Sequence, residues 1–326
     1  MEKIPTVVIS LSPERLKPLM SQLEGCPALL VHIQKGFIGK KVIDNSKLID
    51  RTAFKFLNGR EMTSGEAGCA LAHFSVYQKI FEHEWKWTLV LEDNARLLPG
   101  AQREILMLLE ALQSSDSFNR LPILIHLNLN EARIVARRIR ICNSFEIYEP
   151  LTILRTTKAY LINDLAAKIA LKDGLPLKDV ADWPHWIHGV KFLASIKDSV
   201  YVDRSFPSEI ELRLTPRAVV QKLHRRILSA MLFISGIEAL RYRRNTGLLD
   251  YFLWVIMDRI HRVAAIFFGR QDQDNTNVIL VENSILRHLK SVALHHYRAA
   301  IKRRHLGKGP IQEMLSQTDI TNLVGK

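Results

Sequence analysis

The sequence predicts an α/β domain over residues 1–214, followed by a mostly helical, basic region over residues 215–326. In the first part, short β-branched runs alternate with stretches of helical spacing, the pattern of a sheet covered by helices. Near Thr215-Pro216 this alternation stops, and long apolar stretches with interspersed arginines begin. The composition, 47% hydrophobic and 24% charged, is that of a globular chain with a large core and excludes disorder of the whole chain.

The N-terminal residues predict two strands and a helix. Thr6–Leu11 is a β-branched run that ends at Ser-Pro, which favours a strand. Pro13–Leu23 places leucine and methionine at helical spacing, and Ala28–Ile33 is a second strand-like run. Residues 35–60 show no clear periodicity, so we expect a loop there.

The segment from Thr63 to about Glu84 is predicted to be a helix. Thr63-Ser-Gly-Glu66 is a capping-box pattern, in which the threonine and the glutamate satisfy the first backbone amides. Glu66 and His73 are seven residues apart, so a helix places both on one face beside an apolar stripe. The capping box alone explains Glu66, and a lone histidine is more often a satisfied core residue than a catalyst.

A buried-type strand, Trp87–Leu91, follows and ends in Glu92-Asp93-Asn94. In open α/β sheets, ligands bind outside the carboxyl ends of the strands. Carboxylate and amide oxygens suit Mg²⁺ or Mn²⁺, which are often shared with substrate phosphates. This acidic cluster is therefore a candidate cation site, and the alternative is a strand end with solvated acids.

The remainder of the first part continues the alternation of helices and strands. The expected elements are a helix at about 100–112, strands at Ile123–Leu129 and Ala159–Ile162, and a short helix near 164–172.

One more carboxylate is a candidate for chemistry. Asp182 stands beside Trp183, with Trp186 three residues farther on. Tryptophan rings pack well against sugar rings, and a carboxylate beside them can act as a base. The alternative is a turn that leads into a helix with Pro184 at its start.

Positive charge is concentrated in the C-terminal third. Residues 215–326 hold 18 Lys/Arg and 8 Asp/Glu, a net charge of +10 out of +13 for the chain. This asymmetry indicates an anionic partner. Leu248–Phe268 adds aromatic residues to the arginines, which favours helices lying in an anionic membrane surface. The alternative is an ordinary helical domain with a solvated basic face, and no motif supports binding to nucleic acid.

Cysteine usage and the N-terminal sequence indicate the compartment. The three cysteines, Cys26, Cys69 and Cys142, are odd in number and lack a metal-type spacing, which favours a reducing environment. The first residues lack the charged-then-apolar build of a signal peptide, and no run of about 18 apolar residues predicts a spanning helix.

Three blocks of the chain together resemble glycosyltransferase family 25, the lipooligosaccharide galactosyltransferase family. The first block is Val8-Ile-Ser-Leu11 with Arg15. The second comprises Leu57-Asn-Gly-Arg60, Thr63-Ser-Gly-Glu-Ala-Gly-Cys-Ala-Leu-Ala-His73 and Leu89-Val-Leu-Glu-Asp-Asn94. The third comprises Lys158-Ala-Tyr-Leu-Ile162, Ala166-Ala167, Ala181-Asp-Trp-Pro184 and Pro207-Ser-Glu-Ile210.

This resemblance implies a nucleotide-sugar-binding domain of the GT-A type that transfers galactose from UDP-galactose with inversion. It implies a divalent cation, Mn²⁺ or Mg²⁺, at the acidic motif. The implied acceptor is a lipooligosaccharide, lipopolysaccharide or other surface glycan. We accordingly expect a cytoplasmic protein, peripheral at the inner face of a bacterial inner membrane.

The resemblance places the acidic motif at Glu92, Asp93 and Asn94, and the chemistry of an inverting transfer suggests roles for further residues. Asp93 and Asn94 are the expected metal ligands, and Asp93 is also an expected catalytic residue. Asp182 is the expected base. The expected donor-binding residues are Arg15, Arg60, Glu66, His73 and Glu92, with the two arginines suited to phosphate. The alternative for Arg60 is a solvated loop charge.

Two positions depart from the family pattern. Asn94 stands where the family usually has aspartate, and Ala72 stands where serine is usual. An asparagine offers an oxygen without charge, so we expect weaker metal binding. This leaves open a catalytically weakened relative that acts as a membrane-associated binding protein. Another donor, such as UDP-glucose, is a further alternative.

Overall fold

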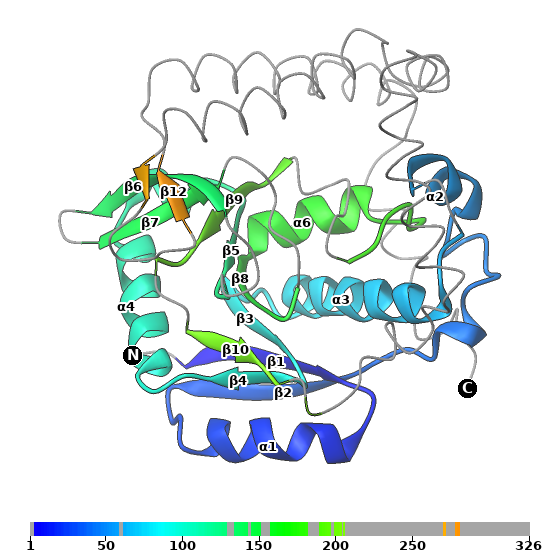
Figure 1. The fold of residues 1–326 in the computed structure, drawn as a ribbon, viewed down its shortest axis with the longest axis horizontal. Coiled ribbons are helices and arrows are strands. Elements are labelled where there is room, and N and C mark those ends of the chain that lie inside the picture. Colours follow the sequence, from blue (N-terminus) through cyan, green and yellow to red (C-terminus); the bar gives the residue numbers. More distant parts are fainter. Residues whose placement is uncertain are drawn as a thin grey trace, which may run out of the picture.

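The computed structural model describes residues 3–58, 61–128, 134–142, 145–150, 157–181, 189–196, 199–203, 205, 270–271 and 278–280 (Figure 1). They form a ten-stranded sheet flanked by helices, with a separate two-stranded sheet beside it. The predicted α/β class is therefore confirmed. Within these ranges, no helix is both long and apolar enough to cross a bilayer.

The large sheet is mixed. Its strands lie in the order β11 (Arg270–Gln271), β12 (Val278–Leu280), β6 (Ile134–Cys142), β7 (Phe145–Pro150), β9 (Lys191–Ala194), β5 (Ile123–His126), β8 (Ala159–Asn163), β3 (Trp87–Glu92), β1 (Ile4–Ser10) and β2 (Leu29–Lys35). Strand β1 pairs in parallel with both β2 and β3, whereas β8 is antiparallel to its neighbours β3 and β5. The carboxyl ends of β1, β2 and β3 therefore meet at one edge.

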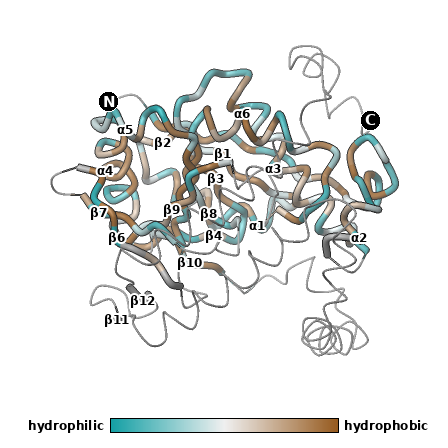
Figure 2. Tube along the Cα trace, turned by 90° about the horizontal axis from the view of Figure 1, so that it is seen from above, coloured by the Kyte–Doolittle hydropathy of each residue, from teal (hydrophilic) through white to brown (hydrophobic). Residues whose placement is uncertain are grey.

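Helices cover both faces of the sheet. They are α1 (Pro13–Glu24), the 3₁₀ helix η1 (Gly39–Lys41), α2 (Arg51–Asn58), α3 (Ser64–Glu82), α4 (Ala101–Gln113), α5 (Asp116–Asn119) and α6 (Asp164–Asp173). Val7 and Val90 face the core beneath α3 and α6, whereas Val8 and Leu89 face the core beneath α1 and α4. Strands that are buried on both faces of a sheet have sequences that are continuous apolar runs. Figure 2 shows these apolar segments in the middle of the molecule, at β1, β3 and β8.

The predicted elements of the first 128 residues are confirmed to within a few residues, with three exceptions, one of which is the unpredicted four-residue helix α5. The expected loop over residues 35–60 is wrong in part, because η1 and α2 form there. Strand β4 (Ala95–Leu97) follows the acidic cluster without a sequence signal, because three residues show no periodicity.

Later in the chain, the strand Ala159–Ile162 and the helix near 164–172 are confirmed as β8 and α6. The basic region, expected to be mostly helical, also contributes the strands β11 and β12, and β12 pairs in parallel with β6. The proposed boundary at Thr215-Pro216 and the helices expected over residues 221–268 lie outside the described residues.

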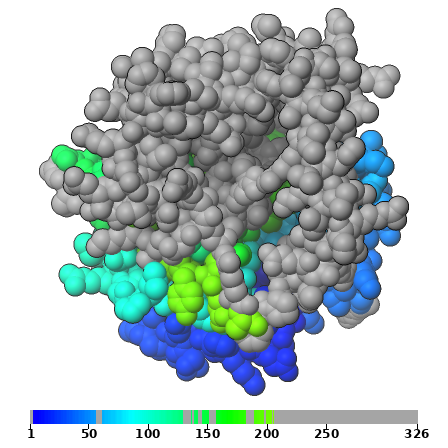
Figure 3. Space-filling view, viewed as in Figure 1, coloured from blue at the N-terminus to red at the C-terminus, as the bar shows by residue number. Residues whose placement is uncertain are grey.

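Strand β4 pairs with β10 (Val200–Val202) to form the small sheet. The pairing is antiparallel and joins Ala95 to Val202 and Leu97 to Val200. In the space-filling view, the yellow-green surface of residues near 200 lies between the blue surface of the N-terminal residues and the cyan surface of residues near 100 (Figure 3). A segment about 100 residues later in the chain thus returns to the turn that follows β3.

Two glycines allow η1 to pack directly on the start of α3. A Cβ atom added at Gly39 would overlap the backbone carbonyl of Ser64, and one added at Gly68 would overlap the carbonyl of Phe37. Backbone atoms of two elements therefore touch where any side chain would separate them. This contact fixes the N-terminal end of α3, and with it the direction of the helix that carries His73.

We expect Gly39→Ala to lower the free energy of unfolding by about 2–3 kcal/mol, because the methyl group overpacks a backbone contact. Urea denaturation of the purified chain measures this change. Gly25→Ala is the matched control, because its added methyl group would lie 3.5 Å from the Gln22 carbonyl oxygen, an ordinary contact. Equal stability of the two variants would show that η1 shifts without cost.

Candidate functional site

The edge where β1, β2 and β3 end is the first part of the candidate site. In the sheet, Ile9 lies opposite Glu92, and Ser10 lies opposite Lys35. The chain leaves β1 into α1 and leaves β3 into the turn Glu92-Asp93-Asn94. The sequence prediction that this acidic cluster closes a strand is confirmed.

Asp93 is held by β1 and α1. Its amide donates to the Ile9 carbonyl at 3.0 Å, and the Ser10 hydroxyl donates to Asp93 Oδ2 at 2.8 Å. Arg15 donates from Nε and Nη2 to Asp93 Oδ1, at 3.0 and 2.8 Å. The exposed fractions of the two side chains are 20% for Arg15 and 9% for Asp93. Arg15 and Asp93, predicted to bind phosphate and metal separately, thus form an ion pair with each other.

Arg96 supports the turn from the other side. Its Nη1 donates to the carbonyls of Asp93 and Ala95, at 2.8 and 2.7 Å, and its Nη2 pairs with Asp203 Oδ2 at 2.8 Å. The Asp203 amide donates to the Asn94 carbonyl at 2.8 Å. Sequence reasoning missed Arg96 and Asp203, because no short-range pattern connects residues about 100 positions apart.

The helix α3 brings His73 to the same turn. Its capping box forms as predicted: the Glu66 amide donates to Thr63 Oγ1 at 3.2 Å, and the Thr63 amide donates to Glu66 Oε2 at 2.9 Å. Two turns later, His73 Nε2 lies 3.4 Å from Glu92 Oε1. Glu92 and His73, both expected to bind the donor, are therefore neighbours in the structure. The Glu66 carboxylate serves the helix start, and its role toward a donor stays a prediction.

A chain of polar side chains extends from Glu92 into the core. Thr157 donates to Glu92 Oε1 at 2.9 Å, and His73 Nδ1 lies 2.8 Å from the Tyr160 hydroxyl. Tyr160 in turn donates to the Tyr77 hydroxyl at 3.4 Å. Tyr160 and Thr157 were not predicted, although Tyr160 lies in one of the blocks that carry the family resemblance. Alternation within a strand does not distinguish a functional tyrosine from a core one.

The environment of Glu92 favours its charged form. Burial raises the pKa of Glu92, but hydrogen bonds from His73 and Thr157, together with the positive charges of His73 and Lys158, bring the pKa below its ordinary value. Burial also raises the pKa of Tyr160 well above the ordinary value, and the neighbouring Tyr77 adds to this effect. Glu92 is therefore a carboxylate and Tyr160 a neutral phenol at neutral pH.

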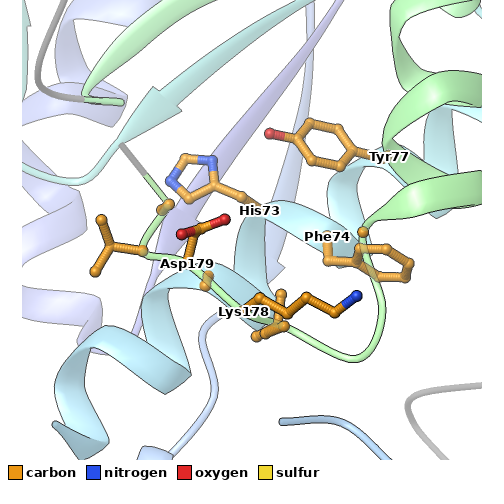
Figure 4. A pocket seen from close by; sticks show the side chains of 10 residues that line it. His73, Phe74, Tyr77, Lys178 and Asp179 are labelled. Atoms are coloured by element: carbon orange, nitrogen blue, oxygen red, sulfur yellow. The ribbon is translucent and has the colours of Figure 1, made fainter. Parts of the chain in front are cut away.

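His73 also lines a narrow pocket. It is lined on α3 by Ala70, His73, Phe74 and Tyr77, and on the loop after α6 by Gly174, Leu177, Lys178, Asp179, Val180 and Ala181. In Figure 4 the Asp179 carboxylate is directed toward His73, whereas the Lys178 amino group points away from it. Asp182 is the next residue after Ala181 but lies outside the described residues, as does Arg60. Their assigned roles stay predictions.

The acidic turn fits a divalent cation weakly. Asn94 Oδ1 is buried and has no hydrogen-bond partner among the described residues, so a cation there would satisfy it. Asp93 already accepts bonds from Ser10 and Arg15, and the Arg15 charge opposes a second cation nearby. A neutral amide oxygen and a paired carboxylate make a cation site of low affinity.

Curated relatives and solved structures are similar to parts of this chain. A stretch of 59 residues, 18% of this chain, is 36% identical to mouse procollagen galactosyltransferase 2 and 31% identical to the human protein of that name. The match spans 9% of the length of each relative. Among solved structures, the crystal structure of mannose-1-phosphate geranyltransferase from Thermus thermophilus matches with a TM-score of 0.30 and 12% identity, over 60% of this chain and 74% of that chain.

A family-wide comparison covers more than half of the chain. The profile described as glycosyltransferase family 25 (LPS biosynthesis protein) matches residues 3–174. This range contains Arg15, the α3 helix with His73, the acidic turn and Tyr160, but not Asp203 or the pocket residues 177–181. The chain therefore belongs to glycosyltransferase family 25, a family of transferases.

Proposed function

We propose that this chain transfers a hexose, galactose from UDP-galactose, with inversion at the anomeric carbon. The proposed acceptor is a lipooligosaccharide, lipopolysaccharide or other surface glycan. Family membership supports a sugar donor and a glycan acceptor, and the two curated relatives carry the name galactosyltransferase. The domain organisation also supports a nucleotide-sugar site of the GT-A type, because ligands of α/β sheets bind at the carboxyl edge of the strands.

One observation carries the proposal: Glu92 and His73 join the acidic turn to the α3 pocket. Their side chains are 3.4 Å apart, and His73 also lines the pocket. This pair therefore connects the carboxyl edge of β1, β2 and β3 to the pocket beside α3. The donor diphosphate would lie over the strand edge, and the acceptor hydroxyl would enter from the pocket side. The loop that lines this pocket leads from Ala181 directly to Asp182, the proposed base.

Each candidate residue has a separate role in the proposed transfer. Asp182 takes the proton from the acceptor hydroxyl as its oxygen attacks the sugar. Arg60 binds the donor phosphates, while Arg15 keeps Asp93 in place through their ion pair. His73 and Glu92 hold each other in place between the strand edge and the pocket. A divalent cation at Asp93 and Asn94, when bound, would neutralise charge on the leaving diphosphate.

The donor is tested with a panel of nucleotide sugars on the full-length chain. UDP-galactose is expected to raise the melting temperature, because a ligand that binds only the folded state stabilises it. UDP release in the presence of a glycolipid acceptor measures transfer. Binding without UDP release would support the alternative of a weakened, membrane-associated binding protein. Preferred release from UDP-glucose would change the donor and leave the reaction class intact.

We predict that sugar transfer depends weakly on a divalent cation and that an added carboxylate at the acidic turn strengthens this dependence. Chelator should lower transfer, and added Mn²⁺ should restore it. Asn94→Asp is expected to tighten Mn²⁺ binding by about tenfold, since a second carboxylate joins the site. The Mn²⁺ concentration that gives half-maximal activity measures this change. Full activity of the original chain in chelator would remove the cation from the proposal.

We also propose that the basic region attaches the protein to an anionic membrane at the cytoplasmic face. The net charge of +10 over residues 215–326 supports this, because anionic lipid contributes about 1 kcal/mol per nearby Lys or Arg. The full-length chain is expected to float with anionic vesicles, and the 215–326 deletion is expected to stay at the bottom of the gradient. Failure of the full-length chain to float at low salt would contradict attachment.

A further inference from the structure

A cysteine, a histidine and a glutamate converge where α3 meets the end of β3. Cys69 and His73 are one helical turn apart on α3, and Glu92 ends β3. The Cys69 sulfur, a His73 ring nitrogen and a Glu92 carboxylate oxygen all lie within 4.8 Å of one another. Thiolate, imidazole and carboxylate are the three ligand types of zinc sites.

The spacing of two of these atoms already suits a tetrahedral ion. His73 Nε2 and Glu92 Oε1 are 3.4 Å apart. Bonds of about 2.0–2.1 Å from a tetrahedral zinc ion to nitrogen and oxygen place those two ligand atoms roughly 3.4 Å apart. The Cys69 sulfur lies within 4.8 Å of a His73 ring nitrogen and a Glu92 carboxylate oxygen, so it is placed as the third ligand.

The hydrogen bonds around these side chains are those of an outer coordination shell. When His73 Nδ1–H donates to Tyr160, Nε2 points at the carboxylate of Glu92, and either a proton or a cation on Nε2 must lie between the two atoms. A metal ion bound there takes the place of that proton. Thr157 holds the same carboxylate oxygen of Glu92. Partners of this kind fix the tautomer and orientation of metal-binding histidines and carboxylates.

We propose that Cys69, His73 and Glu92 bind a borderline-soft divalent cation of the zinc type. The thiolate and the imidazole favour zinc over the hard cations Mg²⁺ and Mn²⁺. Three protein ligands leave a fourth position for water or a substrate oxygen. This site is distinct from the cation proposed at Asp93 and Asn94, and it does not rest on the proposed sugar transfer.

Titration of the full-length, metal-free chain with Co²⁺ tests the site. Cobalt replaces zinc and reports a thiolate ligand through sulfur-to-metal charge transfer in the near ultraviolet. We expect saturation at one equivalent, with displacement by Zn²⁺. Cys69→Ser should abolish the charge-transfer band. Tyr160→Phe should retain it and weaken binding by roughly 10–100-fold, because it removes only the outer partner of His73.

The matched control is Cys26→Ser/Cys142→Ser, which leaves Cys69 as the chain's single cysteine. This variant should keep the full band. Far-ultraviolet circular dichroism establishes that each variant is folded before titration. Absence of the band in the folded original chain overturns the proposal, as does a band that survives Cys69→Ser or disappears in the double variant. Because the readout is metal binding, a negative result leaves the transferase proposal standing.

Discussion

The Asp182→Asn variant is expected to lose sugar transfer by about 10²–10⁴-fold while it binds the donor almost as tightly as the original chain. The substitution keeps the shape of the side chain and removes its ability to accept the proton of the acceptor hydroxyl. Single-turnover transfer with a glycolipid acceptor measures the loss. The shift of the melting temperature by UDP-galactose measures donor binding separately.

Two further variants sharpen this test. Asp116→Asn is the neutral control, because Asp116 is an exposed residue at the start of α5. Asp179→Asn examines the other carboxylate near His73, which lines the pocket in Figure 4. Loss of transfer in Asp179→Asn with full transfer in Asp182→Asn would move the base to Asp179. Full transfer in both variants would mean that neither carboxylate takes the proton.

Removing Arg15 is expected to destabilise the fold by about 2–4 kcal/mol, because it leaves the Asp93 carboxylate buried without its cation. Asp93→Ala should have a similar effect, because it leaves the Arg15 guanidinium without its carboxylate partner. The double variant should lose less than the two single losses together, with a coupling of about 1–3 kcal/mol. Urea denaturation of the four proteins measures this cycle.

A second ion pair provides the comparison. Arg51 Nη1 lies 2.7 Å from Asp44 Oδ1, but the two side chains are 50% and 79% exposed. Arg51→Ala is therefore expected to cost about 0–1 kcal/mol. If Arg15→Ala lowered donor affinity and left stability unchanged, Arg15 would be a phosphate ligand, as the sequence first suggests, rather than the support of Asp93.

Most of the N-terminal fold can be predicted from local pattern. The strand at β3 is a continuous apolar run, and α3 is indicated by its capping box and its helical spacing. Strands β4 and β10 cannot be predicted in this way, because each has three residues and exists only through its partner. Helix α2 is missed for a related reason, since its eight residues span barely two turns.

The candidate site shows the same division. The proximity of His73 to the acidic turn follows from a helix and a strand that each have a clear signal, and His73 lies 3.4 Å from Glu92. The pairing of Arg15 with Asp93 follows from the register of β1 and β3, which no residue type specifies. Arg96 and Asp203 meet only after the chain has returned to β4. The local sequence thus identifies charged side chains that need an ion-pair partner, whereas the three-dimensional fold determines which residue that partner is.

The return of the chain to the turn after β3 has a mechanical consequence. The small β4–β10 sheet, the ion pair of Arg96 with Asp203 and the amide bond to Asn94 tether residues 200–203 to the acidic turn. The basic region begins at Thr215, about a dozen residues after Asp203 in the chain. If that region binds a charged surface, as proposed, these contacts would transmit a pull on the chain to the loop that holds Asp93 and Asn94. Binding to the surface would then alter the shape of the acidic turn.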